Sequence, residues 1–241
     1  MKHRLFLYIT LIIIGILFSS SVRSQQTQID SLIEVVHTST DSTLKVDAMI
    51  ALVDELNETN YKRALQYADE AISLAKKIDY AKGLARIYYY VAHTYNYMAQ
   101  YNSALDYYFR KLHLDDSLNL PVEKGQTLNL IGNIYYTVKA YEKAEDYYLQ
   151  SLNIFQNNDF SPGMSDIYNN LGNIAFNRDE PDKADYYYHK SLEIDIEKKD
   201  YSGITISYSN LGNLYYQLYR DTSAINYYRK GLAFLNRVDY K

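Results

Sequence analysis

Few side chains in this sequence of 241 residues have the types and the spacing that catalysis or metal binding requires. The motifs HExxH, GxxxxGK(S/T), GxGxxG and GxSxG are all missing. His113 with Asp115 and Asp116 comes nearest to a metal site, but on a helix these side chains point to different faces. Cysteine is absent, which excludes a thiolate metal site and a cysteine nucleophile. We therefore expect no metal site, no cofactor and no catalytic residue, and hence no enzyme.

A second set of polar residues suits binding rather than catalysis. Asn133, Asn173 and Asn213 lie forty residues apart, and further amide and aromatic side chains share their predicted helical face. The candidate peptide-groove residues are Asn129, Asn133, Tyr136, Asn169, Asn170, Asn173, Phe176, Asn210, Asn213 and Tyr216. An amide side chain offers a donor and an acceptor, which suits the backbone of an extended peptide. The alternative is that these asparagines tie one repeat to the next, and the sequence leaves both roles open.

A forty-residue repeat predicts the elements that position these residues. Glycine, alanine and tyrosine each return at a fixed place in three successive repeats. The structural positions of the repeat are Gly132, Ala144, Tyr148, Gly172, Ala184, Tyr188, Gly212, Ala224 and Tyr228. Self-similarity at a period of about 20–50 residues is typical of stacked repeat architectures.

Each repeat reads as two helices separated by a polar break. In the fourth repeat, apolar residues at helical spacing precede a break at residues 177–180, and Pro181 begins the second helix, where its missing N–H does no harm. The stretches 158–163 and 199–203 both end in glycine. We expect these glycines to end helices in the left-handed conformation.

The recurring small residues predict how the helices pack. We expect Gly172 and Ala184 to meet where the two helices of one hairpin cross, since larger side chains would push the backbones apart. Tyr188 and Leu192 would then fill the space between one hairpin and the next. The first repeat differs from the others, because Leu52 stands where glycine is expected.

These positions resemble the tetratricopeptide repeat, which places Gly or Ala in its first helix, Tyr three residues later and Ala twelve residues after the Gly. Gly132, Tyr135 and Ala144 occupy these places. The resemblance implies an all-α, right-handed solenoid of about five hairpins over residues 44–241, and the long period is similar to that of kinesin light chain. The implied units are residues 44–83, 84–123, 124–163, 164–203 and 204–241, preceded by a short leading helix within 25–43.

The resemblance also implies a function. In this family the first helices line a concave face that binds proteins or peptides. The subclass that captures acidic C-termini uses Lys and Arg there, and only Arg86, beside Tyr89 and His93, could contribute here. We therefore expect a non-enzymatic scaffold that binds a protein or peptide through this face, without capture of an acidic C-terminus.

Residues 1–24 have the layout of a secretory signal peptide. Lys2 and Arg4 precede an apolar run of 14 residues and a small, polar stretch that suits cleavage after Ser24. The alternative, an uncleaved membrane anchor, is disfavoured because spanning a bilayer takes roughly 17–25 apolar residues. We expect export across the inner membrane to the periplasm or cell envelope, with membrane contact only if this segment stays uncleaved.

The charge of the exported chain argues against nucleic acid as a partner. Removing residues 1–24 takes away Lys2, Arg4 and Arg23 but no acidic residue, which leaves 22 basic and 29 acidic residues, a net charge of −7. Binding to a polyphosphate backbone needs the opposite sign.

The layout of signal segment, short helix and repeats also resembles the exported N-terminal part of certain bacterial signalling proteins. In those proteins the repeats lead to a membrane helix and a cytoplasmic kinase, cyclase or DNA-binding domain. The alternative function is therefore the sensory region of such a protein. Because the final RVDYK (residues 237–241) matches KIDY at residues 77–80, where another repeat starts, we expect the chain to be part of a longer protein.

Overall fold

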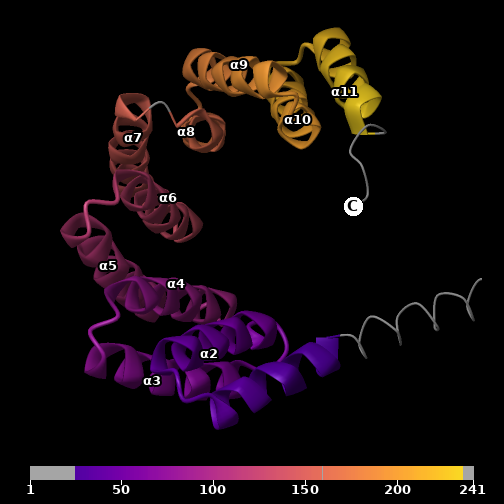
Figure 1. Cartoon of the computed structure of the whole chain (residues 1–241). Coiled ribbons are helices and arrows are strands. Elements are labelled where there is room, and N and C mark those ends of the chain that lie inside the picture. Colours follow the sequence, from indigo (N-terminus) through magenta and orange to yellow (C-terminus); the bar gives the residue numbers. More distant parts are fainter. Residues whose placement is uncertain (1–24, 159, 236–241) are drawn as a thin grey trace, which may run out of the picture. The chain divides into compact units, whose positions relative to one another are not determined.

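The computed structural model describes residues 25–158 and 160–235, and every regular element in these ranges is a helix (Figure 1). A leading helix covers residues 25–38. It is followed by α2 (Ser42–Leu56), α3 (Tyr61–Lys77), α4 (Ala81–Tyr97), α5 (Tyr101–Ser117), α6 (Pro121–Thr137), α7 (Tyr141–Asn157), α8 (Ser161–Asn177), α9 (Pro181–Lys198), α10 (Tyr201–Gln217) and α11 (Asp221–Leu235). Hairpins are formed by α2 with α3, α6 with α7, α8 with α9 and α10 with α11, so the protein is an all-α helical-repeat solenoid, as the sequence predicts.

The chain divides within α5 into two compact units, one ending at Leu114 and the other beginning at Asp115. None of the helices in the described ranges combines the length and the apolar character that a membrane span needs. The predicted signal segment, residues 1–24, lies outside the described residues.

The turns between helices correct one expectation from the sequence. Gly163 and Gly203 lie inside the first turns of α8 and α10, and no glycine in the described ranges has a positive φ. The left-handed residues are instead Asp79, Ala99, Asn119, Lys139, Asp179, Lys199 and Tyr219. At Lys199 (φ 59°), the next N–H, from Asp200, reaches the carbonyl of Asp195 at 2.9 Å. This hydrogen bond satisfies an orphan carbonyl and offsets a conformational cost of about 1–2 kcal/mol.

The role of the recurring glycine is also different from the expected one. A Cβ atom built on Gly172 of α8 would lie 2.5 Å from Cε1 of Tyr188 on α9, and the nearest atoms are all from that ring rather than from Ala184. Gly132 has the same relation to Tyr148, at 2.6 Å. The glycine therefore makes a notch for the tyrosine ring of its own hairpin. The expected crossing of Gly172 with Ala184 is wrong as its explanation.

The first hairpin solves the same packing problem without a ring. Leu52 on α2 and Ala68 on α3 occupy the places that Gly172 and Tyr188 hold later, and both are buried in one apolar core with α4. Ile29 and Val36 of the leading helix belong to the same core. The leading helix therefore covers the outer side of the first hairpin.

Candidate functional site

Asn133, Asn173 and Asn213 each follow a glycine notch on the first helix of a hairpin. In each hairpin the side-chain Oδ1 accepts a hydrogen bond from the hydroxyl of the tyrosine that fills the notch. The oxygen–oxygen distances are 2.7 Å for Asn133–Tyr148, 2.9 Å for Asn173–Tyr188 and 2.7 Å for Asn213–Tyr228. Glycine, asparagine and tyrosine thus keep their places together, because the ring needs the notch and its hydroxyl needs the amide.

Burial keeps these hydroxyls as donors. It raises the pKa of Tyr148 and of Tyr188 above the ordinary value of a phenol. Since the hydroxyl stays protonated, it fixes the direction in which the Asn133 or Asn173 amide points. Within the described part of the chain, Nδ2 of Asn173 has no hydrogen-bond partner. The side chain is half-buried, so part of it is exposed to solvent. The amide therefore has a donor to offer at the surface.

The other asparagines of the predicted groove link the first helices of successive repeats. Nδ2 of Asn170 on α8 donates to Oδ1 of Asn129 and of Asn133 on α6, at 3.3 and 3.1 Å. Nδ2 of Asn210 on α10 donates to Oδ1 of Asn169 on α8 at 3.2 Å. This is the structural role that the sequence left open, and the links join Asn129, Asn133 and Asn170 in one set and Asn169 and Asn210 in another.

The aromatic members of the predicted set differ in exposure. Tyr136 is half-buried, and its hydroxyl accepts a hydrogen bond from Nδ2 of Asn177 at 3.0 Å. Phe176 packs against the core of the fourth and fifth hairpins. Tyr216 is 66% exposed, so its ring is open to a ligand. Only Tyr216 therefore offers a largely free aromatic surface.

A buried polar cluster between α9 and α10 escaped the sequence analysis. Asp195 is 1% exposed, and its Oδ2 accepts hydrogen bonds from the hydroxyls of Ser207 and Ser191 at 3.3 and 3.4 Å. Asn169 donates to Ser191 at 2.7 Å. A Cβ atom on Gly203 would lie 2.6 Å from the Asp195 carboxyl carbon, so this glycine makes room for the carboxylate. Burial raises the pKa of Asp195.

The residues considered for a metal site do not converge. Asp115 is buried and accepts a hydrogen bond from Thr127 at 2.7 Å, whereas His113 is exposed. Asp116 forms an ion pair with Lys124. In the described ranges, no three His, Cys, Asp or Glu side chains gather in a way that could hold a metal ion.

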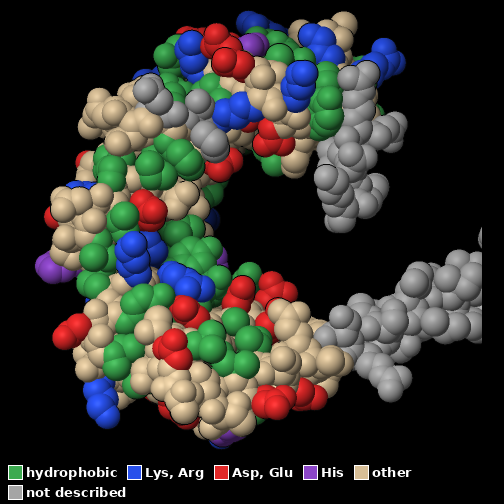
Figure 2. Space-filling view, viewed as in Figure 1, with side chains coloured by type: hydrophobic (Ala, Val, Ile, Leu, Met, Phe, Trp, Pro, Cys, Tyr) green, Lys and Arg blue, Asp and Glu red, His purple; other side chains and the backbone are tan. Residues whose placement is uncertain are grey.

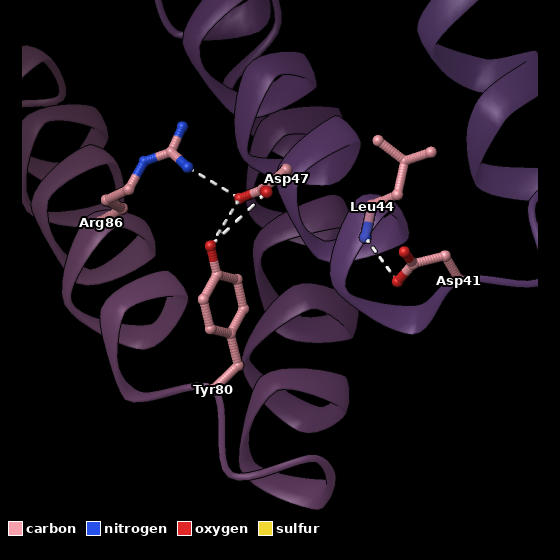
Figure 3. A network of polar contacts seen from close by, with 5 residues as sticks. All are labelled: Asp41, Leu44, Asp47, Tyr80 and Arg86. Carbon is pink, nitrogen blue, oxygen red and sulfur yellow. Dashed lines mark hydrogen bonds and ion pairs between the residues drawn. The ribbon is translucent and has the colours of Figure 1, made fainter.

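Arg86 is not available as an anion clamp. Its Nη1 lies 2.7 Å from Oδ1 of Asp47, which also accepts a hydrogen bond from the Tyr80 hydroxyl at 3.3 Å (Figure 3). Asp47 lies on α2 and Arg86 on α4, so the pair links the first two hairpins. On the face seen in Figure 2, acidic and basic side chains are interspersed rather than gathered into one basic patch. That face offers no continuous site for a polyanion.

Comparisons with known proteins agree with this architecture. Residues 125–158 and 163–237 each match a sequence model described as tetratricopeptide repeat. Comparison with curated proteins finds no match. Similar solved structures include BtubC (BKLC) from P. vanneervenii, with a TM-score of 0.76, 20% identity and 92% of each chain covered.

Two further structures are similar over most of this chain. A Rap protein complexed with competence and sporulation factor has a TM-score of 0.67 and 15% identity, covering 92% of this chain and 73% of that chain. A Podospora anserina putative kinesin light chain with nearly identical TPR-like repeats has a TM-score of 0.65 and 11% identity, covering 84% and 100%. At these identities the likeness shows the fold.

Proposed function

Because the chain is a tetratricopeptide repeat protein, a fold that serves as a scaffold for protein–protein interaction, we propose that it is a non-catalytic scaffold that binds an extended peptide segment along the first helices of its repeats. The observation that carries this proposal is the row of tyrosine-held amides at Asn133, Asn173 and Asn213. Each amide is oriented before a ligand arrives, so little side-chain entropy is lost when a peptide carbonyl binds to it.

The row suits main-chain recognition in particular. The amides recur once per repeat on equivalent faces of α6, α8 and α10, and neutral amides do not select for the charge of the ligand. Asn170 and Asn210 hold neighbouring first helices in register through their links to Asn129 and Asn169. The partner is therefore expected to contribute an extended backbone rather than a single charged end group.

The test begins with a displayed library of random twelve-residue peptides, selected on the purified chain. Affinities of three enriched peptides are then measured for the original chain and for Asn173→Ala and Asn213→Ala. Loss of one hydrogen bond of about 1–1.5 kcal/mol weakens binding by roughly tenfold. Unchanged affinities for both variants would overturn the groove assignment.

Asn173→Ala also removes the acceptor of the Tyr188 hydroxyl, so the binding loss needs matched controls. Tyr188→Phe removes the hydroxyl but keeps the amide, and we expect it to weaken binding less than Asn173→Ala. Asn153→Ala on α7 removes an exposed amide from a second helix and should leave affinity unchanged. Thermal unfolding of each variant separates a local binding loss from a loss of folded protein.

We further propose that the protein is exported, and that the sensory region of a transmembrane signalling protein is its second candidate role. The support is the signal-like layout of residues 1–24. The mass of the protein isolated from a Gram-negative host should correspond to a chain beginning at Gln25, and an intact Met1 contradicts cleavage. A coding sequence that continues into an apolar segment and an output domain supports the sensory role, whereas a stop codon after Lys241 contradicts it.

A further inference from the structure

The amide row changes character in the first unit. Where α6 has Asn129, Leu130 and Asn133, the equivalent positions of α4 hold Tyr89, Tyr90 and His93. These three side chains line a cavity of about 340 Å³ between α4 and the end of α2. Cavities of roughly 300–1,000 Å³ are the usual size of sites for small ligands and side chains.

One wall of the cavity is aromatic. Tyr89, His93 and Tyr97 follow one another at intervals of four residues along α4, and so share a face of that helix. The ring centroids of Tyr89 and His93 are 4.5 Å apart, and those of His93 and Tyr97 are 6.2 Å apart. Tyr90 meets the Tyr89 ring edge-on at 5.1 Å. The rings form a continuous surface with electron-rich faces.

The opposite wall is acidic. Asp54, Glu55 and Glu58 line the cavity from the last turn of α2 and the turn that follows, and its lining includes no lysine or arginine. Glu55 accepts a hydrogen bond from Gln28 of the leading helix at 2.7 Å. The Tyr97 hydroxyl donates to Glu58 Oε1 at 3.1 Å. The carboxylates are thereby held beside the rings.

Two further features of the cavity fit a basic ligand. Among the described residues, an arginine or lysine lies over six tyrosine rings elsewhere, but none lies over a ring that lines the cavity. The six are Tyr67, Tyr107, Tyr135, Tyr208, Tyr215 and Tyr227. Nε2 of His93 is buried and has no hydrogen-bond partner in the described part of the chain. Burial also lowers the pKa of His93, so its ring is neutral at pH 7 and does not compete with a cation.

We propose that this cavity, between the end of α2 and α4, binds an arginine or lysine side chain of a peptide partner. Carboxylates at Asp54 and Glu58 match the charge of a guanidinium or ammonium group, and the rings add cation–π attraction. Arg86, the nearest base on α4, is paired with Asp47 rather than with a carboxylate of the cavity. This assignment rests on the proposed function and names a basic side chain as part of what the scaffold recognises.

The probe is a capped five-residue peptide, Gly-Ser-Arg-Ser-Gly, titrated into the isotope-labelled chain and followed by amide resonances. The control peptide carries citrulline, the neutral isostere of arginine. We expect shifts confined to the end of α2 and to α4, and an affinity about tenfold higher for the arginine peptide. Equal affinities for the two peptides would overturn the proposal.

Charge-neutral variants test the residues themselves. Asp54→Asn and Glu58→Gln keep the shapes of exposed side chains, so we expect both variants to fold. Each should lower the affinity for the arginine peptide several-fold. Glu70→Gln on α3, also exposed, is the matched control and should change nothing. If both cavity variants bind the arginine peptide with unchanged affinity, the proposed site is wrong. If free arginine amide binds as tightly as the arginine peptide, the ligand is not a peptide.

The cavity test and the groove test can fail independently of each other. The cavity test uses residues of α2 and α4, whereas the groove test uses Asn173 and Asn213 of α8 and α10. If library peptides depend on the amide row but the citrulline peptide binds as well as the arginine peptide, the groove stands and the cation site is wrong. If the reverse holds, the chain binds basic side chains without using the row.

Discussion

The packing between α3 and α4 and the packing between α9 and α10 occupy equivalent places three repeats apart, yet they differ in polarity. The first contains Ala71, Ala75 and Ile87, and the second contains Ser191, Asp195 and Ser207, all of them buried. The forty-residue repeat therefore keeps these places buried, but it fixes neither the size nor the polarity of the side chain that fills them. The polar version is tolerated because its members hydrogen-bond to one another.

The interiors of the hairpins differ in the same pair of regions. The first hairpin combines Leu52 with Ala68, whereas the fourth combines Gly172 with Tyr188. The large and small side chains have exchanged helices, so the pair still fills one space. The exchange has a polar consequence, because the tyrosine hydroxyl needs Asn173, where the first hairpin has the buried Val53.

The largest effect on stability is expected from replacing only one residue of the Gly172 and Tyr188 pair. Tyr188→Ala empties a fully buried aromatic site, and we expect a loss of about 3–5 kcal/mol in the free energy of unfolding. Adding Gly172→Leu to that variant recreates the Leu52 and Ala68 arrangement, and should recover at least about 1 kcal/mol. Gly172→Leu alone should destabilise by about 1–3 kcal/mol, since its side chain meets the Tyr188 ring. Urea titrations measure all three.

Lys183→Leu on the exposed face of α9 is the control for adding an apolar side chain, and should stay within about 0.5 kcal/mol. If the losses of Tyr188→Ala and Gly172→Leu simply add in the double variant, the two regions do not share a common packing solution.

A smaller effect is expected from the buried carboxylate. Burial raises the pKa of Asp195, which means that the folded protein is more stable with this carboxyl group protonated than with it ionised. The extra stability is present at low pH and is lost as the pH rises through the raised pKa. At pH 7, Asp195→Asn should therefore stabilise the protein by on the order of 1 kcal/mol, and less at pH 4. Chemical unfolding from pH 4 to pH 8 measures the difference.

Glu193→Gln, an exposed carboxylate on the same helix, should not change the pH profile. If the profiles of Asp195→Asn and the original chain run parallel, then the carboxylate of Asp195 is not destabilised by its surroundings. The cluster would in that case resemble the apolar packing of α3 against α4 in its energetics.

The hairpins could be predicted from the sequence because apolar spacing and the forty-residue period determine them. The residue that packs against Gly172 could not be predicted in the same way. Ala184 and Tyr188 lie four residues apart on one face of α9, so periodicity allows either to meet Gly172. The helix ends were missed for another reason. Lys199, Asp179 and Tyr219 have no residue type in common, so the left-handed position gives no signal in the sequence.

The amide row was predicted as a set of positions, but its contacts depend on the geometry of the folded hairpin. Asn173 and Tyr188 lie fifteen residues apart on different helices, and a repeat pattern does not say that their side chains touch. The cavity beside Tyr89 and His93 was missed because its acidic wall comes from the preceding repeat. Both features depend on which helices are neighbours.

The smallest effect concerns single links between successive repeats, and it compares the ion pair Arg86–Asp47 of the first unit with the amide hydrogen bond Asn210–Asn169 of the second. Arg86 and Asp47 are 2.7 Å apart, but their side chains are 53% and 34% exposed. Exposed pairs contribute about 0.2–1 kcal/mol, and at about 1 M salt the Debye length falls to about 3 Å. Arg86→Ala should therefore lose about 0.5 kcal/mol at low salt and almost nothing at high salt. Asn210→Ala, which removes the amide tie to Asn169, should show a loss that salt does not change. Urea midpoints at the two salt concentrations measure both losses. A salt-independent loss for Arg86→Ala would mean that its side chain acts through packing against α2 rather than through its charge.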